Sequence, residues 1–312
     1  MKNLVEPTSA VEAVVVEEAD PSPRLDGPGI GRGVLYIVAS AFAFSIMTSL
    51  VKVAGRHLPS QEIVGARALV SLALSYAMVR RAGLSPWGTH RRLLLMRGFL
   101  GYLALTCVFH AVTTLPLADA TVIQYLYPVF TAVLATAFLG ERPTVAIVAA
   151  GAASLVGITL VAKPSVLFGS LTTAPNPVDV AIAVAGAFFT SVAYVGVKKL
   201  TALEHPLVIV FYFPLVTLPA TLPAILHAPV MPRGWDWALL AAIGVATQFG
   251  QVWLTRGLQY ETATRATALT YLQVVFAATW GALFFAEVPD GLSVAGGVLV
   301  VSGAFALALQ RR

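Results

Sequence analysis

The sequence predicts an all-α integral membrane protein whose ten transmembrane helices form two inverted five-helix repeats. Three observations lead to this fold class: the composition, the spacing of the apolar runs and an internal repeat. The chain has 312 residues, of which 58% are hydrophobic and only 11% are charged. Soluble domains carry about 25% charged residues, so this chain has too little polar surface to cover a core of its size in water.

The apolar residues are gathered into long runs. Nine runs contain no Asp, Glu, Lys or Arg, and a tenth, 63–79, is interrupted only by Arg67. Each run is close in length to the roughly 20 residues that a helix needs to cross the hydrocarbon layer, and none alternates as a barrel strand would. We therefore expect helices at about 33–53, 63–79, 94–115, 120–140, 145–162, 180–200, 206–226, 237–259, 265–286 and 292–310.

An internal repeat relates the two halves of the chain. The stretch 120–143 reads ATVIQYLYPVFTAVLATAFLGERP and returns 146 residues later, at 266–289, as ATALTYLQVVFAATWGALFFAEVP. Lys52 and Lys198 match at the same offset. Because each half has an odd number of helices, the second half enters the membrane upside down. Such inverted repeats hold a substrate near the midplane between the halves and alternate access to it.

Two segments lie outside the repeats. Residues 1–32 combine six acidic residues with four prolines and predict a disordered acidic tail. Residues 164–179 are rich in Pro, Ser and Thr and predict a linker. The expected domains are thus a first repeat at 33–163 and a second at 180–310.

The basic residues predict the orientation. With a cytoplasmic N-terminus, fifteen Lys and Arg residues, Arg97 among them, fall on the cytoplasmic side. Four fall outside: Lys52, Arg56, Lys163 and Arg233. Cytoplasmic loops are enriched in Lys and Arg, so we expect both termini in the cytoplasm of a cell-membrane protein. The net charge of +5 follows from this asymmetry and does not indicate a nucleic-acid partner.

Polar side chains recur at helical spacing in four of the expected helices. In the fourth, Thr121, Gln124, Tyr125, Pro128 and Thr131 share one face, which lipid tails would not solvate. Such a face either lines a substrate cavity or bonds a neighbouring helix, and threonines often bond their own backbone. Further substrate-binding candidates are Tyr102 and His110 on the third helix, Gln248 and Gln251 on the eighth, and Thr270, Tyr271, Gln273 and Trp280 on the ninth.

Charged residues near the helix ends suggest further roles. Arg67 either extends outward to water or faces the cavity and attracts a carboxylate or phosphate. Its repeat partner is Phe213, so the repeat does not require a charge there. His110, the partner of Arg256, can take up a proton near neutral pH or bond within the protein. We expect gating residues at Asp119 on the outer side, and at Arg256 and Arg265 on the inner side unless these two only anchor the orientation.

Enzyme motifs are missing from the sequence. It has no G-x-x-x-x-G-K-[ST], no H-E-x-x-H and no Cys/His cluster, so we expect no ATP hydrolysis, cofactor or metal. The lone Cys107 lies in an apolar run that would keep its thiol protonated. The alternatives are a membrane enzyme acting on a lipid or prenyl-linked substrate and a non-transporting scaffold. The first predicts paired carboxylates within the membrane, and the second predicts no polar stripes.

Two tandem five-helix units, with a fourth helix ending in FLGERP and a ninth in FFAEVP, resemble the EamA branch of the drug/metabolite transporter superfamily over about 33–310. The phrases LADATVIQYLYPVFTAVLA and YLQVVFAATWGALFFAEVP are similar to the G members of solute carrier family 35. The resemblance implies a carrier of small organic metabolites, often an exporter, with a cavity lined by helices 3, 4, 8 and 9. Pro128 fits the family pattern, whereas Val274 stands where related repeats often carry proline.

The residues and the resemblance together predict a secondary transporter, not an enzyme. We expect it to export a small polar metabolite, such as an amino acid, by alternating access. Its expected partners are that small molecule and the lipid bilayer. Small residues at helical spacing in the fifth and tenth helices favour close packing within the chain or a homodimer: Gly151, Ser154, Gly157, Gly296, Gly297 and Gly303.

Overall fold

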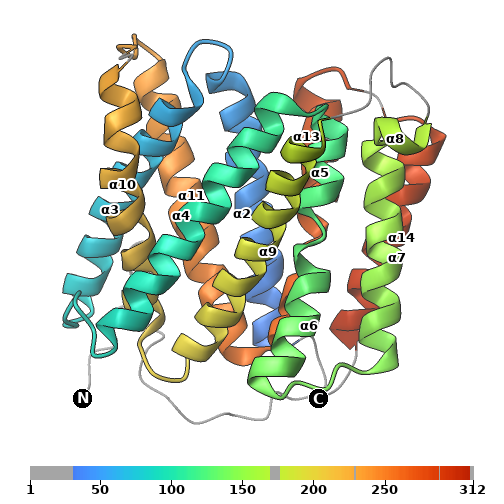
Figure 1. The fold of residues 1–312 in the computed structure, drawn as a ribbon, viewed down its shortest axis with the longest axis horizontal. Helices are drawn as coiled ribbons and strands as arrows, with labels where there is room; N and C mark the ends of the chain where they lie inside the picture. The colour runs from blue at the N-terminus through green and yellow to red at the C-terminus, as the bar shows by residue number, and fades with distance from the viewer. Residues whose placement is uncertain (1–30, 169–175, 228–229, 288, 310–312) are drawn as a thin grey trace, which may run out of the picture.

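The structure is a computed structural model, and it describes residues 31–168, 176–227, 230–287 and 289–309. Within these ranges the regular structure is entirely helical, and ten segments are long and apolar enough to cross a membrane (Figure 1). The fold class is therefore the one expected. Nearly all of the expected tail and about half of the expected linker lie outside the described residues.

Each half contributes five membrane spans. The first half holds α2 (Arg32–Ala54), α3 (Ser60–Arg81), α4 (Arg91–Thr114), α5 (Leu117–Gln124) with α6 (Tyr127–Leu139), and α7 (Val145–Ala162). A short helix, α8 (Ser165–Phe168), follows within the segment expected to be a linker. The second half holds α9 (Pro177–Leu200), α10 (Pro206–His227), α11 (Asp236–Tyr260), α12 (Ala263–Leu269) with α13 (Leu272–Phe284), and α14 (Gly291–Leu309).

The fourth and ninth spans are each broken near the middle, where single helices were expected. At the break between α5 and α6, the second residue of α6, Pro128, has no N–H, and the Val129 N–H bonds three residues back to the Leu126 carbonyl at 3.0 Å. Between α12 and α13, the Val274 N–H likewise bonds three residues back, to the Tyr271 carbonyl at 3.0 Å. A tight turn therefore replaces the α-helical pattern in both halves, with proline in one and without it in the other.

The two halves meet through helix pairs that the repeat relates. The α2–α11 pair is the repeat image of the α4–α9 pair, while α3–α10 and α7–α14 are each their own image. Figure 1 shows α7 and α14 side by side at one edge and α3 and α10 at the other. The contact between the halves therefore follows the two-fold relation read from the sequence.

Close packing of α7 on α14 depends on glycine. A Cβ added to Gly157 would lie 2.5 Å from the Gly296 carbonyl oxygen, and one added to Gly296 would lie 2.4 Å from the Gly157 oxygen. A Cβ added to Gly151 or Gly297 would meet no other atom within 4 Å. Of these small residues, Gly157 and Gly296 therefore pack within the chain, whereas Gly151 and Gly297 face away from the α7–α14 contact.

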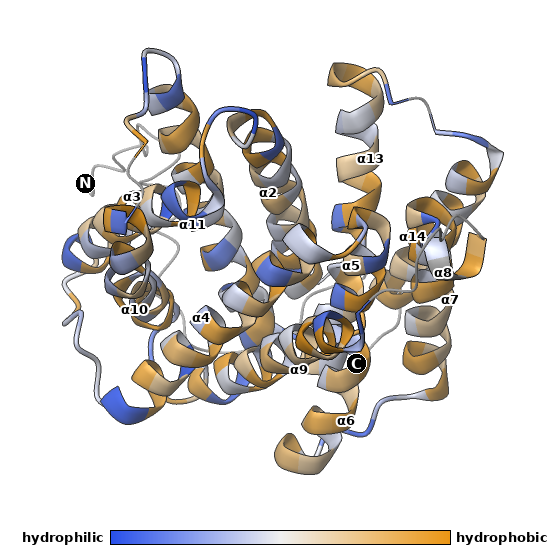
Figure 2. Cartoon of the chain, turned by 45° about the horizontal axis from the view of Figure 1, so that its top comes forward, coloured by the Kyte–Doolittle hydropathy of each residue, from blue (hydrophilic) through white to orange (hydrophobic). Residues whose placement is uncertain are grey.

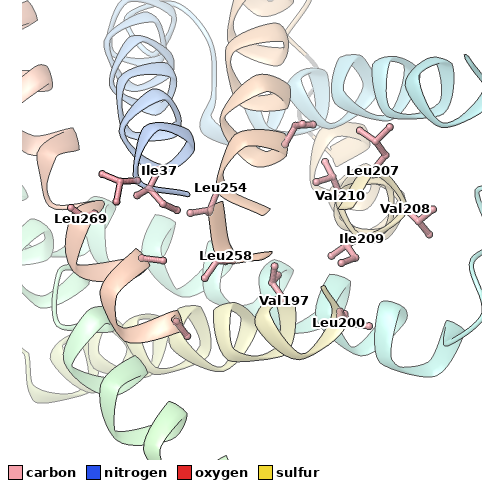
Figure 3. Close-up of a cluster of buried hydrophobic side chains, with 14 of the residues drawn as sticks. Ile37, Val197, Leu200, Leu207, Val208, Ile209, Val210, Leu254, Leu258 and Leu269 are labelled. Atoms are coloured by element: carbon pink, nitrogen blue, oxygen red, sulfur yellow. The ribbon is translucent and has the colours of Figure 1, made fainter. Parts of the chain in front are cut away.

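The main apolar core lies at the end of the bundle where α2 begins. Figure 3 shows Ile37 of α2, Leu254 and Leu258 of α11, Val197 of α9 and Leu269 of α12 together in this core. At the opposite end the buried apolar residues form separate smaller clusters, one on α2, α3 and α11 and another on α4, α5 and α9. One apolar core therefore joins both halves at the end where α2 begins (the packed end), whereas the buried apolar residues at the other end fall into separate clusters.

The outer surface of the bundle is apolar. Phe138, Val145, Leu283 and Phe284 are each more than 60% exposed, at 74%, 86%, 66% and 72%. Figure 2 shows hydrophobic residues along the outward sides of the helices. Such an apolar surface exceeds what a soluble monomer exposes, and it fits the acyl chains of a bilayer.

Candidate functional site

A cavity of about 280 Å³ lies between the two halves. It is lined from α2, α3, α4, α5, α9, α10, α11 and α13. Small-molecule sites typically enclose ~300–1,000 Å³, so the cavity suits a small metabolite. Its polar lining consists of Arg67, Arg97, Gln124, Thr190, Tyr194, Gln251 and Gln273, and Phe44, Met47 and Phe213 are among its apolar residues.

Arg97 of α4 is the most deeply buried cation of the cavity. The residue is 4% exposed, and Nη2 donates to the Gln251 Oε1 at 3.2 Å. The guanidinium carbon lies 4.8 Å from the centre of the Phe213 ring, a cation–π distance. Its Nε and Nη1 atoms are buried without a hydrogen-bond acceptor. Arg97 thus lines the cavity and has two buried donor atoms without an acceptor.

Arg67 of α3 lines the same cavity. Its Nη1 lies 3.8 Å from the Met47 sulfur, a weak acceptor. Arg67, Gln248 and Gln251 also line a much smaller space of about 10 Å³ directly behind the cavity. The sequence allowed Arg67 to extend outward to water or to face the cavity. In the structure the side chain faces the cavity.

The glutamines of the expected site have different positions. Gln124 donates to Thr190 Oγ1 at 3.3 Å, and Gln251 accepts from Arg97, so both join the cavity wall across helices. Gln273 also lines the cavity. Gln248 lies behind it, where Oε1 accepts from Ser75 Oγ at 3.0 Å.

Several expected site residues lie outside the cavity lining. The Tyr102 hydroxyl donates to the Ala220 carbonyl at 3.3 Å, and His110 Nε2 lies 2.8 Å from Asp179 Oδ1. The Trp280 indole donates to Ser45 Oγ at 2.9 Å. Each of these polar groups bonds another helix. Bonding to a neighbouring helix was the alternative that the sequence left open to substrate contact.

The remaining candidates form a tyrosine cluster at the helix breaks. The Tyr271 hydroxyl donates to the Tyr125 carbonyl at 3.1 Å, and the two rings pack together. Tyr127 bonds Thr270 through their hydroxyls and packs its ring on Tyr194, which lines the cavity. This cluster joins the fourth and ninth spans directly behind the cavity wall.

The structure also places Thr121 and Thr131 against their own helices. Thr121 Oγ1 donates to the Leu117 carbonyl at 2.7 Å, and Thr131 Oγ1 donates to the Tyr127 carbonyl at 2.8 Å. The break after Gln124 interrupts the face that a continuous helix would have presented. Of that face, only Gln124 lines the cavity.

The packed end of the bundle is closed by polar contacts around α12. Lys198 Nζ donates to the Leu258 and Glu261 carbonyls at 2.8 and 2.7 Å. The Glu141 carboxylate accepts from the Ala263 and Thr264 N–H groups at 2.6 and 3.1 Å, which satisfies free donors at the start of α12.

Two of the expected gating residues, Arg265 and Arg256, also lie at this end. Arg265 pairs with Glu261 at 2.9 Å, and its Nε donates to the Leu307 carbonyl at 3.0 Å. The Arg256 guanidinium lies 5.9 Å from the centre of the Tyr36 ring. Both arginines are buried, so the packed end holds cations as well as apolar side chains.

The opposite end lacks the equivalent closure. All seven residues of α12 are buried, whereas in α5, which begins the equivalent span of the first half, only Asp119 and Ala120 are buried. Asp119 accepts from Ser165 of α8, and its other oxygen has no partner. Glu287, the repeat partner of Glu141, pairs with Lys52 and not with the start of α5. The end where α5 begins is therefore less closely packed than the end where α12 begins.

Three polar residues of the cavity were not expected from the sequence: Arg97, Thr190 and Tyr194. Arg97 had been counted with the cytoplasmic cations because it lies near the start of its span. The expected helix began at about 94, three residues before Arg97, whereas α4 begins at Arg91 and places Arg97 six residues, about 9 Å, inside the span. Thr190 and Tyr194 are four residues apart on α9, a spacing that places them on one face.

Comparison with known proteins agrees with this architecture. The model of the EamA-like transporter family matches residues 31–163 and 179–309. A solved crystal structure shares the fold with a TM-score of 0.78 at 20% identity, covering 88% of this chain and 95% of that one.

Curated relatives are named as transporters. The pseudopaline exporter CntI of Pseudomonas aeruginosa is 37% identical over 281 residues, covering 90% of this chain and 97% of the relative. Human solute carrier family 35 member G1 is 28% identical over 304 residues, with 94% and 83% covered. The S-adenosylmethionine uptake transporter of Rickettsia prowazekii is 26% identical over 276 residues, with 86% and 90% covered. This chain is a multi-pass membrane protein that belongs to the EamA-like transporter family.

Proposed function

We propose that the protein is a secondary carrier that exports a small polar organic metabolite, such as an amino acid, by alternating access between its two halves. The observation that carries this proposal is the polar cavity between the halves, in a bundle whose two ends are unequally packed: all of α12 is buried, and most of α5 is not. A pore would be open at both ends, and a scaffold has no need of a polar cavity at the membrane midplane.

The inverted repeat supplies the second state. Exchanging the conformations of the two halves would pack α5 as α12 is packed now and would release α12. Glu287 would then meet the start of α5, as Glu141 meets the start of α12. The cavity would open at the other end, and the repeated helix pairs between the halves would keep their partners.

Loop charges support an orientation for this cycle. Fifteen Lys and Arg residues against four favour a cytoplasmic N-terminus, so the packed end would be the inner end and the described state would face outward. Export agrees with the name of the 37% identical Pseudomonas relative, whereas the Rickettsia relative is named for uptake. Direction therefore needs a measurement of its own.

The test is flux in proteoliposomes. Vesicles loaded with a mixed panel of amino acids, carboxylic acids, amines and nucleosides would be compared with protein-free vesicles, and efflux would be followed by mass spectrometry. We expect faster efflux of some panel members. Leu105→Trp, which places a large ring at the cavity wall, should abolish it, and Phe99→Trp, on the exposed side of the same helix, should not. If no panel member leaves faster than from protein-free vesicles, the carrier proposal fails.

A further inference from the structure

The two arginines of the cavity have no acidic partner in the part of the chain that the structure describes. Arg67 contacts the Met47 sulfur, and Arg97 contacts the Gln251 amide oxygen and the Phe213 ring. Among the residues that the structure describes, no Asp or Glu lines the cavity or the small space behind it. The cavity therefore carries two positive charges and only neutral compensation.

The carboxylates of the described chain are engaged elsewhere. There are nine, and each has a polar partner away from the cavity. These contacts are Glu62 with the Val230 N–H, Asp119 with Ser165, Glu141 with Ala263 and Thr264, Asp179 with His110, Glu204 with Thr89 and His90, Asp236 with the Arg233 N–H, Glu261 with Arg265, Glu287 with Lys52, and Asp290 with Lys163. No acidic residue of the described chain is therefore placed to neutralise the two arginines.

The fold does not require these two charges. The repeat partner of Arg67 is Phe213, and the repeat partner of Arg97 is Ile243. Some polar residues near the helix ends do recur as matched types, such as Glu141 with Glu287 and Lys52 with Lys198. The two arginines have no such counterpart, so the repeat does not account for them.

The energetic cost of the arginines also favours a ligand. The desolvation cost of a buried charge without an ionic partner exceeds the stabilisation that a cation–π contact provides. Arg97 pays this cost with two of its donor atoms unused. An anion in the cavity would supply the missing charge, and the planar guanidinium favours a carboxylate because two parallel hydrogen bonds can form.

We infer that the substrate is a small organic acid with two carboxylates, one bound by Arg67 and the other by Arg97. This inference rests on the proposed carrier function. Both arginines line one cavity of about 280 Å³ together with Gln251 and Phe213, so a single small molecule can contact both. Gln124, Gln273 and Thr190 would bond the remaining polar groups of the substrate, and Phe44 and Phe213 its carbon chain.

Matched acids and amides test the inference on the purified full-length protein. Glutarate carries two carboxylates, its monoamide one and its diamide none, at nearly constant size. Binding would be measured by thermal shift and by competition for flux. We expect glutarate, or its homologue succinate or adipate, to bind at least tenfold more tightly than the monoamide, and the diamide not to bind. Chloride at the same ionic strength shows whether any small anion suffices.

Variants of the two arginines test whether each arginine binds one carboxylate of the substrate. Arg67→Gln and Arg97→Gln should each weaken diacid binding at least tenfold and should bring the diacid and the monoamide within about twofold of each other. Arg67→Lys and Arg97→Lys keep the charge and should recover part of the loss, which a misfolded variant could not do. Arg80→Gln on α3 and Arg92→Gln on α4 remove exposed cations from the same helices and should bind as the wild type does.

The outcomes separate the inference from the carrier proposal. Flux of neutral or cationic metabolites that survives both glutamine variants would leave the carrier standing and overturn the diacid inference. Equal binding of the diacid and the diamide, or stabilisation by chloride alone, would overturn it as well. Diacid binding that depends on both arginines, without flux of any panel member, would support the site and remove the carrier.

Discussion

Lys52 and Lys198 occupy equivalent positions in the two halves but bind different partners. Lys198 donates to the Leu258 and Glu261 carbonyls at the packed end, while Lys52 pairs with the Glu287 carboxylate at the opposite end. One lysine closes its end of the bundle, and the other is held by an exposed ion pair. The two ends therefore differ in contacts although they share a sequence pattern.

We expect Lys198→Ala to destabilise the described state much more than Lys52→Ala. Hydrogen bonds from a charged group contribute about 1.5–3 kcal/mol, whereas an exposed ion pair contributes ~0–1 kcal/mol. The side chains of Lys52 and Glu287 are 44% and 57% exposed. Thermal unfolding of both variants in one detergent would compare them. Equal midpoints would contradict the assignment of the closed end.

Glu141→Gln and Glu287→Gln should differ in the same way. Glu141 accepts from two backbone N–H groups and from Thr264 Oγ1 at 2.9 Å, so neutralising it weakens three charge-assisted bonds at the start of α12. We expect a loss of about 1–3 kcal/mol for Glu141→Gln and under ~1 kcal/mol for Glu287→Gln. Unfolding by increasing SDS in mixed micelles would measure both.

Two adjacent glycines of α14 provide a matched pair. A methyl group on Gly296 would meet the Gly157 carbonyl, but one on Gly297 meets nothing within 4 Å. We expect Gly296→Ala to cost about 1–3 kcal/mol by separating α7 from α14. Gly297→Ala should be neutral or stabilising by up to ~1 kcal/mol through helix propensity. The same unfolding assay applies, and equal effects would contradict the packing.

The Tyr127–Thr270 hydrogen bond joins the two halves behind the cavity. Tyr127→Phe keeps the ring against Tyr194 and removes only the hydroxyl, and Thr270→Val removes the other partner. Each should cost ~0.5–1.5 kcal/mol, and the double variant should cost less than the sum because one bond is lost in all three. A double-mutant cycle on unfolding free energy tests this, and additive losses would show that the hydroxyls act separately.

His110 should not couple flux to protons. It lies outside the cavity lining and contacts Asp179 at 2.8 Å. We expect His110→Ala to leave the dependence of flux on an imposed proton gradient unchanged, and Asp179→Asn to do the same. Flux would be measured in proteoliposomes with and without the gradient. Loss of gradient dependence in His110→Ala alone would assign the coupling site to this residue.

The sequence predicted the membrane spans and the inverted repeat because both depend on composition and on order along the chain. The break in the ninth span could not be predicted from the residue at that position, because Val274 has a normal N–H. The turn there depends on the surrounding helices. Proline marked the first break, and the second had no comparable residue.

The cavity was predicted only in part because polar residues in a membrane helix have two uses. Gln251 and Gln248 are three residues apart on α11, yet one lines the cavity and the other bonds Ser75 behind it. Periodicity identifies the polar face of a helix but not which neighbour covers it. Arg97 was missed for a related reason, because a cation near a helix end fits both an orientation signal and a site.

The fixed positive charge of the cavity also has an electrical consequence. If the protein carries a doubly charged acid, the cavity with Arg67 and Arg97 is neutral when the acid is bound and holds two positive charges when empty. With the proposed orientation, an inside-negative voltage leaves the loaded carrier unaffected and draws the empty one back to the inner side. The field supplies ~2.3 kcal/mol per charge for each 100 mV. Voltage alone would then drive export, and the rate of turnover would report the potential of the membrane.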